Sequence, residues 1–477
     1  MQYTVEQIRE ALNADGRLVT PESRVTRLLT DSRSLSFPEE TIFFAIKTRH
    51  GDGHNYIHEL YSRGVRNFVV NSLERCETLA DANFIVTDDT LAALQALAMQ
   101  HRAKFDIPVI GITGSDGKTI VKEWLYQLTA GDNTVTRSPR SYNSQIGVPL
   151  SAWLLNEKST LGIFEAGISE NNEMGNLQRI IKPTIGIITN ISSAHQENFS
   201  SLQEKCAEKL QLFTGCDTVI YNADDAILDE SIKKSPIKAA KIAWSKKDPN
   251  APLFIESVTK EDKGTAIQYR YGATTGGYRI PFVDDASIED SINCLAAALH
   301  LAVSPEAIAT RMAQLEPVAM RLEVKEGKRG CLIINDSYNS DTASLDIALD
   351  FMERRCNMTP GLRRTVILAD IKQSGESATS LYGTVIGYLK EHSIEKFIGI
   401  GSDISSQTEA FKHTALECHF FDTTAQFIAS PAIRQMHNEC ILIKGSRSFH
   451  FEEITEVLEK KAHQTILEVN LSALRDN

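Results

Sequence analysis

The chain has 477 residues, too many for one hydrophobic core, and its 42% hydrophobic and 23% charged residues are usual for a soluble globular protein. No apolar run approaches the ~20 residues of a membrane-spanning helix, and the start of the chain does not resemble a signal peptide, so we expect a cytoplasmic protein without membrane insertion. A net charge of −12 argues against a nucleic-acid surface but leaves an anionic small substrate open. The eight cysteines include no C-x-x-C pair, which favours scattered reduced thiols over a zinc site or a disulfide framework.

Residues 1–104 are predicted to form a first, small α/β domain. Apolar residues at helical spacing begin at Val5, and short β-prone runs then alternate with helical stretches. The predicted strands cover residues 27–30, 42–46 and 68–70, and the predicted helices cover residues 5–12, 57–63 and 91–102.

Residues 105–315 are predicted to form a central domain around a mostly parallel sheet. A buried strand at residues 107–113 leads into a Gly-rich turn and a helix. Further buried strands are separated by helical patterns, as in a parallel sheet covered by helices. These strands cover residues 162–165, 185–189 and 218–221. Residues 251–283 alternate in polarity as antiparallel strands do, and a helix is expected at residues 292–301.

Residues 316–464 are predicted to form a third domain with a second, Rossmann-like sheet. Its strands are expected at residues 331–334, 366–369, 397–400 and 441–444, with helices between them. Residues 465–477 begin a new strand and helix. The predicted fold class is therefore α/β, with one small domain and two doubly wound domains.

The strongest functional signal is the loop at residues 111–119. A strand ends, glycines stand at every third position, and Lys118 and Thr119 open a helix. Glycines let backbone N–H groups wrap a phosphate, and the N-terminus of the helix adds positive potential. Ile112 stands where the strict P-loop template has its first glycine, so a relaxed variant fits. The strand before it and the helix after it favour this interpretation over a chance glycine turn.

Three further residues lie close in sequence to strands of the same predicted sheet. Glu165 ends a buried strand, at the edge where ligands bind such sheets, and is a natural Mg²⁺ ligand. His195 follows another strand and is a possible ligand or acid. Lys209 lies on a helix of mixed polarity. Taken singly, these residues would be a solvated or capping glutamate, a structural histidine and a surface lysine.

Together, the loop, Glu165, the segment 189–195 and Lys209 occur in the order and spacing of the Mur ligases. These are ATP-dependent amide-forming enzymes of peptidoglycan synthesis, and the resemblance covers the whole chain in three domains. Within the family the chain is most similar to the MurF branch, which joins D-Ala-D-Ala to UDP-MurNAc-tripeptide. The closer resemblance is carried by residues 31–33, 43–47, 51–54, 143–149, 321–324, 336–339 and 444–447.

The resemblance implies a nucleotide site and a metal site. ATP would be bound by Gly114, Ser115, Asp116, Gly117, Lys118, Thr119, Asn293, Arg321 and Asp336. Two Mg²⁺ ions would be held by Thr119, Glu165, His195 and Lys209, the lysine having reacted with CO₂ to become a carbamate. Lys118, His195 and Lys209 would be the catalytic residues.

The resemblance also implies substrate sites and a two-step reaction. Ser32, Arg33 and Lys47 would lie near the UDP group in a substrate-binding first domain. The acceptor and peptide region would contain Asn143, Ser144, Tyr338, Asn339, Lys444 and Ser446. The tripeptide carboxylate would take the γ-phosphate to form an acyl phosphate, and the amine of D-Ala-D-Ala would then displace phosphate.

Some positions depart from the family pattern, mostly around the expected dipeptide pocket. They are Ser144, Gln211, Asn335, Asp341 and Thr342. The open alternatives are another Mur-superfamily amino-acid ligase, a folate-adding ligase, and a catalytically silent nucleotide-binding scaffold.

Residues 467–477 resemble the first strand and helix of alanine racemases. We therefore expect the chain to be the ligase half of a fusion. Pyridoxal phosphate would belong only to a racemase domain beyond Asn477.

Overall fold

The computed structural model describes residues 2–48, 51–74, 76–192, 198–262, 264–318, 323–337, 340, 342–359, 361–371 and 377–460. The chain forms two compact units, residues 1–316 and 317–477, and each is described by itself. Among the described residues, no helix is long and apolar enough to cross a membrane.

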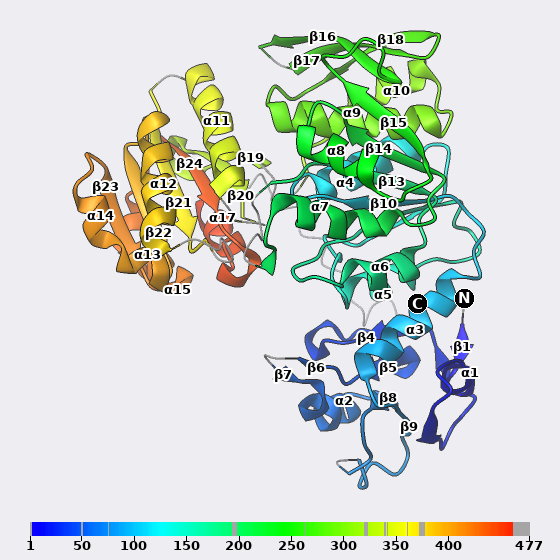
Figure 1. Ribbon diagram of the computed structural model, residues 1–477. Coiled ribbons are helices and arrows are strands. Elements are labelled where there is room, and N and C mark those ends of the chain that lie inside the picture. The colour runs from blue at the N-terminus through cyan, green and yellow to red at the C-terminus, as the bar shows by residue number, and fades with distance from the viewer. Residues whose placement is uncertain are drawn as a thin grey trace, which may run out of the picture. The chain divides into compact units, whose positions relative to one another are not determined.

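The first unit begins with a small five-stranded sheet (Figure 1). Its strand order is β2 (Asp15–Arg17), β9 (Asn83–Val86), β8 (Asn67–Val70), β5 (Thr41–Phe44) and β4 (Arg27–Leu29). All neighbouring strands are parallel except β2, which pairs antiparallel with β9. The helices are α1 (Val5–Ala11), α2 (Ile57–Ser62) and α3 (Thr90–Arg102). The two faces of this sheet carry separate apolar cores, so the predicted α/β fold of this part is confirmed.

Helix α3 joins this part to the rest of the first unit. Asp89 caps the helix by accepting hydrogen bonds from the backbone N–H groups of the first turn. At the other end of α3, the His101 ring is hydrogen-bonded to the Tyr3 hydroxyl at 2.7 Å and stacks near Trp153. The Trp153 indole donates to the Thr26 carbonyl at 2.9 Å. The first and central parts therefore share a packed boundary, and the predicted division after residue 104 stays a prediction.

The central part is built on a nine-stranded sheet. The strand order is β11 (Val135–Arg137), β12 (Leu161–Glu165), β10 (Val109–Thr113), β13 (Ile185–Ile188), β14 (Thr218–Asn222), β15 (Ala240–Ser245), β16 (Leu253–Glu261), β17 (Gly264–Tyr271) and β18 (Thr274–Ile280). The strands are parallel as far as β16, and the last three form an antiparallel extension, as predicted. The chain passes from β10 to one side of the sheet and returns on the other side with β13. The carboxyl end of β10 is thus a topological switch point, where α/β sheets bind ligands.

Helices cover both faces of this sheet (Figure 1). One face is packed by α5 (Gly147–Ala152), α6 (Met174–Ile181), α7 (Leu202–Leu210) and α8 (Ala226–Lys234). The other is contacted by α4 (Lys118–Thr129) and α9 (Asp285–His300), and α10 (Pro305–Met312) packs beside them. Helix α9 begins seven residues before its predicted start, because Asp284 caps it by accepting a hydrogen bond from the Ser287 N–H at 2.8 Å.

The second unit holds a six-stranded sheet. The order is β19 (Glu323–Glu326), β20 (Leu332–Asp336), β24 (Glu439–Lys444), β21 (Arg363–Ala369), β22 (Lys396–Ile400) and β23 (Glu417–Phe421). Only β19 is antiparallel to its neighbour. Helices α11 (Thr342–Met358) and α12 (Ala378–Glu391) contribute to one core, and α15 (Thr424–Ala429), α16 (Pro431–Arg434) and α17 (Glu452–Leu458) to the other. The short helices α13 (Ser402–Ser406) and α14 (Thr408–Lys412) lie between β22 and β23. The predicted second doubly wound sheet is confirmed.

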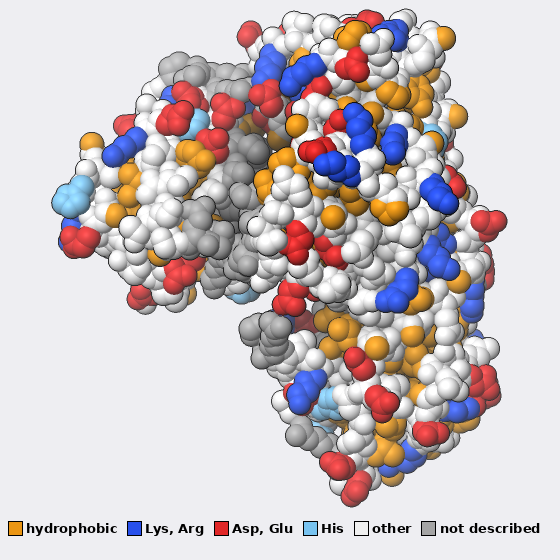
Figure 2. Space-filling view, viewed as in Figure 1, with side chains coloured by type: hydrophobic (Ala, Val, Ile, Leu, Met, Phe, Trp, Pro, Cys, Tyr) orange, Lys and Arg blue, Asp and Glu red, His pale blue; other side chains and the backbone are white. Residues whose placement is uncertain are grey.

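The sequence has 50 basic and 62 acidic side chains and a net charge of −12. On the face shown in Figure 2, basic and acidic side chains are interspersed over the first unit.

Candidate active site

The loop after β10 has a backbone that only glycine adopts easily. Gly114 has φ +140° and Gly117 has φ +77°. A Cβ atom at Gly114 would lie 1.9 Å from the Thr189 hydroxyl oxygen, and one at Gly117 would lie 2.3 Å from Asp290 Oδ1. Both the dihedral angles and the close contacts therefore exclude other side chains at these two positions.

The segment after β13 braces this loop. The Asn190 carbonyl accepts a hydrogen bond from the Ser115 N–H, and its side-chain oxygen accepts one from the Asp116 N–H, both at 2.9 Å. The Ser192 N–H donates to Ser115 Oγ at 2.9 Å, and its hydroxyl donates to Asp116 Oδ2 at 3.1 Å. Two loop amides are therefore used to fix the loop. This leaves the first turn of α4, whose N–H groups have no acceptor within the helix, as the place for a phosphate.

The Lys118 side chain lies over the loop. Its Nζ donates to the Gly114 carbonyl at 2.8 Å and to the Ser115 carbonyl at 2.7 Å. The ammonium group is thus held at the loop by carbonyl oxygens, which a phosphate oxygen can replace as an acceptor.

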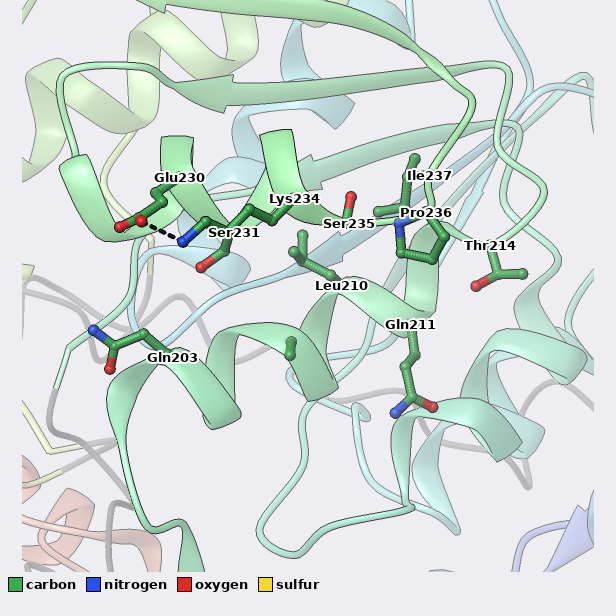
Figure 3. Close-up of a pocket in the computed structure, with 11 residues that line it drawn as sticks. Gln203, Leu210, Gln211, Thr214, Glu230, Ser231, Lys234, Ser235, Pro236 and Ile237 are labelled. Carbon is green, nitrogen blue, oxygen red and sulfur yellow. Dashed lines mark hydrogen bonds and ion pairs between the residues drawn. The ribbon is translucent and has the colours of Figure 1, made fainter.

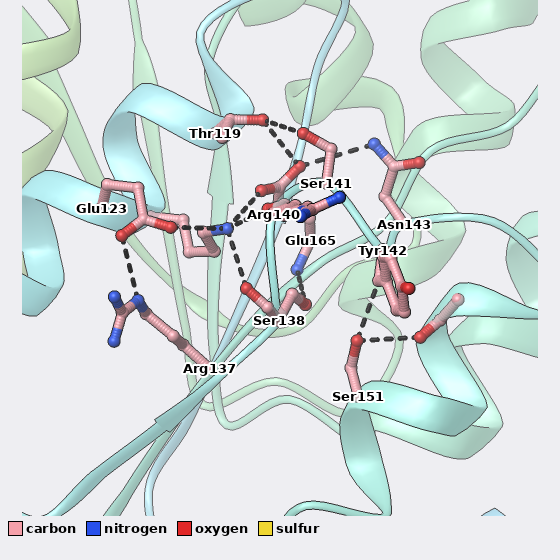
Figure 4. A network of polar contacts seen from close by, with 12 residues as sticks. Thr119, Glu123, Arg137, Ser138, Arg140, Ser141, Tyr142, Asn143, Ser151 and Glu165 are labelled. Carbon is pink, nitrogen blue, oxygen red and sulfur yellow. Dashed lines mark hydrogen bonds and ion pairs between the residues drawn. The ribbon is translucent and has the colours of Figure 1, made fainter. Parts of the chain in front are cut away.

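The end of β12 brings Glu165 to the start of α4 (Figure 4). Glu165 is fully buried, and its Oε2 accepts a hydrogen bond from the Thr119 hydroxyl at 3.1 Å and from Asn143 Nδ2 at 3.4 Å. The Thr119 hydroxyl is also within 2.7 Å of Ser141 Oγ. The solvated alternative for Glu165 is wrong. Ser144, next to Asn143, accepts a hydrogen bond at 3.1 Å from the N–H of Gly147, the first residue of α5.

Helix α7 brings Lys209 to the same loop. The side chain is only 3% exposed, so the surface alternative is wrong, and its Nζ donates to the Gly114 carbonyl at 3.1 Å. Burial, assisted by the nearby ammonium groups of Lys118 and Lys205, holds the pKa of the Lys209 amine well below its ordinary value. Lys205, one turn earlier, donates to the Ser192 carbonyl at 2.7 Å. The lowered pKa favours the neutral form of the Lys209 amine.

The oxygens of Thr119 and Glu165 fit a Mg²⁺ ion. Magnesium takes one or two carboxylates together with substrate phosphates and waters, so two protein oxygens 3.1 Å apart beside a phosphate loop suit it. Within the described part of the chain, no three His, Cys, Asp or Glu side chains are grouped to hold a metal. His195, a predicted ligand, lies outside the described residues.

Asn293 lies on α9 and is fully buried. Its Oδ1 accepts a hydrogen bond from the Trp244 indole on β15 at 2.8 Å. Its Nδ2 has no hydrogen-bond partner among the described residues. A buried amide with an unused donor is the kind of group that a ligand acceptor satisfies.

The predicted UDP residues lie in the first domain and differ in exposure. Ser32 is buried, and its carbonyl accepts a hydrogen bond from the Arg63 guanidinium at 2.8 Å. Arg33 is exposed and paired with Asp31 at 2.6 Å. Lys47 is exposed on the two-residue strand β6 (Lys47–Thr48).

In the second unit, two predicted residues meet at the carboxyl edge of the sheet. Lys444 Nζ, fully buried at the end of β24, donates to Asp336 Oδ2 at the end of β20, at 2.8 Å. The Ser446 and Ser448 hydroxyls are 2.9 Å apart. The predicted residues Arg321, Tyr338 and Asn339 lie outside the described residues.

Sequence reasoning missed Asn190, Ser141 and Lys122. Asn190 and Ser141 give no signal by type, since they act through loop geometry. Lys122 had one signal: it stands three residues after Thr119 and four after Lys118, which places all three on neighbouring positions of one helix.

A cavity of about 550 Å³ lies between α7 and α8 (Figure 3). It is lined by Gln203, Ala207, Leu210, Gln211, Thr214, Glu230, Ser231, Lys234, Ser235, Pro236 and Ile237. At 100° per residue, the α7 residues of this set lie on the face of the helix opposite Lys205 and Lys209. None of the predicted site residues lines this cavity, so it is separate from the loop.

A glycine loop at the switch point of a doubly wound sheet, with a buried carboxylate beside the loop threonine, defines a P-loop nucleotide-binding protein. Residues 112–300 match the Mur ligase middle domain, and residues 320–447 match the Mur ligase, glutamate ligase domain. The chain belongs to the Mur ligase family.

Relatives and solved structures extend this similarity to nearly the whole chain. A UDP-N-acetylmuramoyl-tripeptide--D-alanyl-D-alanine ligase from Bacillus subtilis is 25% identical over 96% of this chain and 98% of its own length. The crystal structure of MurF from Acinetobacter baumannii has a TM-score of 0.80 at 22% identity, covering 96% of this chain and 98% of that chain. MurF ligase from Thermotoga maritima in complex with ADP has a TM-score of 0.71 at 20% identity, covering 90% and 96%. The predicted three-domain fold and the predicted class, an ATP-dependent ligase, are confirmed.

Proposed function

We propose that this protein joins D-Ala-D-Ala to UDP-MurNAc-tripeptide with ATP, releasing ADP and phosphate. The observation that carries the proposal is the buried contact of Thr119 and Glu165 beside Lys118, at the carboxyl edge of the central sheet. Similarity along 96% of the chain to a ligase named for this reaction supports the choice of substrates.

The phosphates of ATP would lie at the N-terminus of α4. Its first-turn N–H groups and the Lys118 ammonium offset their negative charge, and the rigid loop fixes their position before the reaction. The unused Nδ2 of Asn293 would donate to the adenine. Arg321 and Asp336 would bind the phosphates and the ribose.

Two Mg²⁺ ions would be held by Thr119, Glu165, His195 and Lys209. When bound, they neutralise the phosphate charge that opposes the approach of a carboxylate. Lys209 would serve as a carbamate: the neutral amine forms a C–N bond to CO₂ and releases a proton. The lowered pKa of Lys209 supports this, because only the neutral amine carries the lone pair for that bond.

The reaction proceeds in two displacements. A tripeptide carboxylate oxygen bonds to the γ-phosphorus as the bond to the bridging oxygen breaks and ADP leaves. The amine of D-Ala-D-Ala then bonds to the acyl carbon, phosphate leaves and the amine gives up a proton. Lys118 holds the γ-phosphate, and a closed site keeps water from the acyl phosphate.

The two substrates would be bound by residues from different parts of the chain. Ser32, Arg33 and Lys47 would bind the UDP group. The peptide and the acceptor would be bound by Asn143, Ser144, Tyr338, Asn339, Lys444 and Ser446.

Phosphate release tests the proposal. We expect release from ATP to require both UDP-MurNAc-tripeptide and D-Ala-D-Ala, and Lys118→Ala to abolish it in a protein with unchanged circular dichroism. Release that depends on a single amino acid in place of the dipeptide would indicate another ligase of the superfamily. No substrate-dependent release would indicate a silent scaffold. Assays with a diaminopimelate and a lysine tripeptide would identify the third residue.

The fusion to an alanine racemase is a separate prediction. The residues on which it depends, 467–477, lie outside the described residues. Sequencing of the reading frame past the codon for Asn477 tests it, since a racemase coding region must follow if the prediction is correct.

A further inference from the structure

Lys122 is a fully buried lysine that pairs with Glu165 and Glu123, two of the residues labelled in Figure 4. It projects from α4, one turn after Thr119. Its Nζ forms ion pairs with Glu165 Oε1 at 3.1 Å and with Glu123 Oε1 at 2.9 Å. It also donates to the Ser138 carbonyl at 2.8 Å and to the Arg140 carbonyl. A buried ammonium is costly unless it is paired and hydrogen-bonded, and here it is both.

The two oxygens of Glu165 have different partners. Among the described residues, Oε1 accepts no hydrogen bond, and its one charged neighbour is the Lys122 ammonium at an ion-pair distance of 3.1 Å. Oε2 has the Thr119 hydroxyl at 3.1 Å and Asn143 Nδ2 at 3.4 Å. The lysine therefore occupies one oxygen of the carboxylate and leaves the other beside the threonine that opens the helix.

The charges in the cluster around Lys122 balance without a metal ion. Glu123 Oε2 is paired with Arg137 at 3.0 Å, and that guanidinium stacks on the Tyr126 ring at 3.5 Å. Lys122 and Arg137 thus supply two positive charges against two carboxylates, Glu123 and Glu165. Such a buried cluster is stable as a unit, but the removal of one member leaves an uncompensated charge.

We propose that Lys122 is a positioning residue that acts as the permanent counter-ion of Glu165: it holds Oε1 and leaves Oε2, beside Thr119, for Mg²⁺. Its bonds to two carbonyls also fix the loop that contains Ser141 and Asn143. The fold can then form without metal, and the ion can enter and leave with the nucleotide. This inference rests on the metal site of the proposed function.

The test compares thermal unfolding of Lys122→Met in ADP with EDTA and in ADP with Mg²⁺. Loss of the counter-ion is expected to lower the Tm in EDTA by roughly 10 °C, because breaking a buried pair of this kind is strongly destabilising. Mg²⁺ should restore most of that loss, a larger gain than in the wild type. The double variant Lys122→Met/Glu165→Gln should recover stability in EDTA and lose the extra response to Mg²⁺.

The matched control is Lys396→Met, which breaks a buried pair with Glu439 (3.4 Å) in the second unit. Its Tm should fall by a similar amount, with no greater response to Mg²⁺ than the wild type. A fall in Lys122→Met that neither Mg²⁺ nor the second substitution reverses, or no fall at all, would overturn the proposal. If Lys122→Met does not fold, the double variant Lys122→Met/Glu165→Gln provides the test. It must fold if the unpaired charge of Glu165 is the cause of the unfolding, and a double variant that does not fold would also overturn the proposal. Substrate-dependent phosphate release by the wild type is measured separately. Failure of the proposed ligase function can therefore be distinguished from failure of the proposed role of Lys122.

Discussion

The burial of Lys209 predicts an inactive variant that is more stable than the wild type. In the folded protein its side chain is 3% exposed, with one hydrogen bond at 3.1 Å to the Gly114 carbonyl. Its folded-state pKa is well below the ordinary value, because burial and two nearby lysines disfavour the charged form. Lys209→Met keeps the shape of the side chain and removes the amine, so it should abolish turnover and stabilise the fold.

The pH dependence of the free energy of unfolding gives the size of the stability difference between the wild type and Lys209→Met. Between the lowered folded pKa and ~10.4, the ordinary lysine value, the unfolded chain binds one proton at Lys209 that the folded chain does not. The free energy of unfolding of the wild type therefore rises with pH relative to the variant, by about 1.4 kcal/mol per pH unit. The advantage of Lys209→Met is largest below this window and disappears toward its upper end.

Urea unfolding at a series of pH values, in CO₂-free buffer, measures this difference. Bicarbonate should then stabilise the wild type alone, since Lys209→Met lacks the amine on which the proposed carbamate would form. Parallel stability curves for the two proteins across the whole pH range would refute the reasoning, because they would show an amine with an ordinary pKa.

Two further substitutions test the loop and the second unit. Gly117→Ala places a Cβ 2.3 Å from a carboxylate oxygen at φ +77°, so ATP affinity measured by calorimetry should fall roughly tenfold or more, about 1.4 kcal/mol. Gly215→Ala, at φ +87° with open space around it, is the control and should bind ATP normally; equal losses in both would assign the effect to backbone strain alone. Lys444→Met leaves the buried Asp336 without its partner and should cost about 3–5 kcal/mol in urea unfolding, whereas an unchanged midpoint would mean that the pair is dispensable.

The sequence predicted the parts of the site that follow from strand ends. Buried strands such as β10 and β12 are continuous apolar runs, so Glu165 could be placed at the edge of the sheet beside the glycine loop. Edge strands were harder, because β19 and β23 are half-exposed and lack such runs. These strands were not predicted.

The burial of polar residues could not be predicted from the sequence either. Lys205 and Lys209 are one turn apart on a helix of mixed polarity, a pattern typical of a solvated face. They contact the Ser192 carbonyl and the Gly114 carbonyl of the loop after β10, and helix periodicity does not contain such tertiary contacts. The same holds for Lys122, because apart from the neighbouring Glu123 its partners are the Glu165 carboxylate and carbonyls of the loop that follows β11.

The fate of one oxygen atom shows whether the reaction passes through an acyl phosphate. If the tripeptide carboxylate takes the γ-phosphate, then a tripeptide labelled with ¹⁸O in that carboxylate must transfer one labelled oxygen to the phosphate released in each turnover. Mass spectrometry of the phosphate, formed in the presence of ATP and D-Ala-D-Ala, measures this. We expect singly labelled phosphate in step with the peptide product; unlabelled phosphate accompanying the product would contradict an acyl-phosphate intermediate.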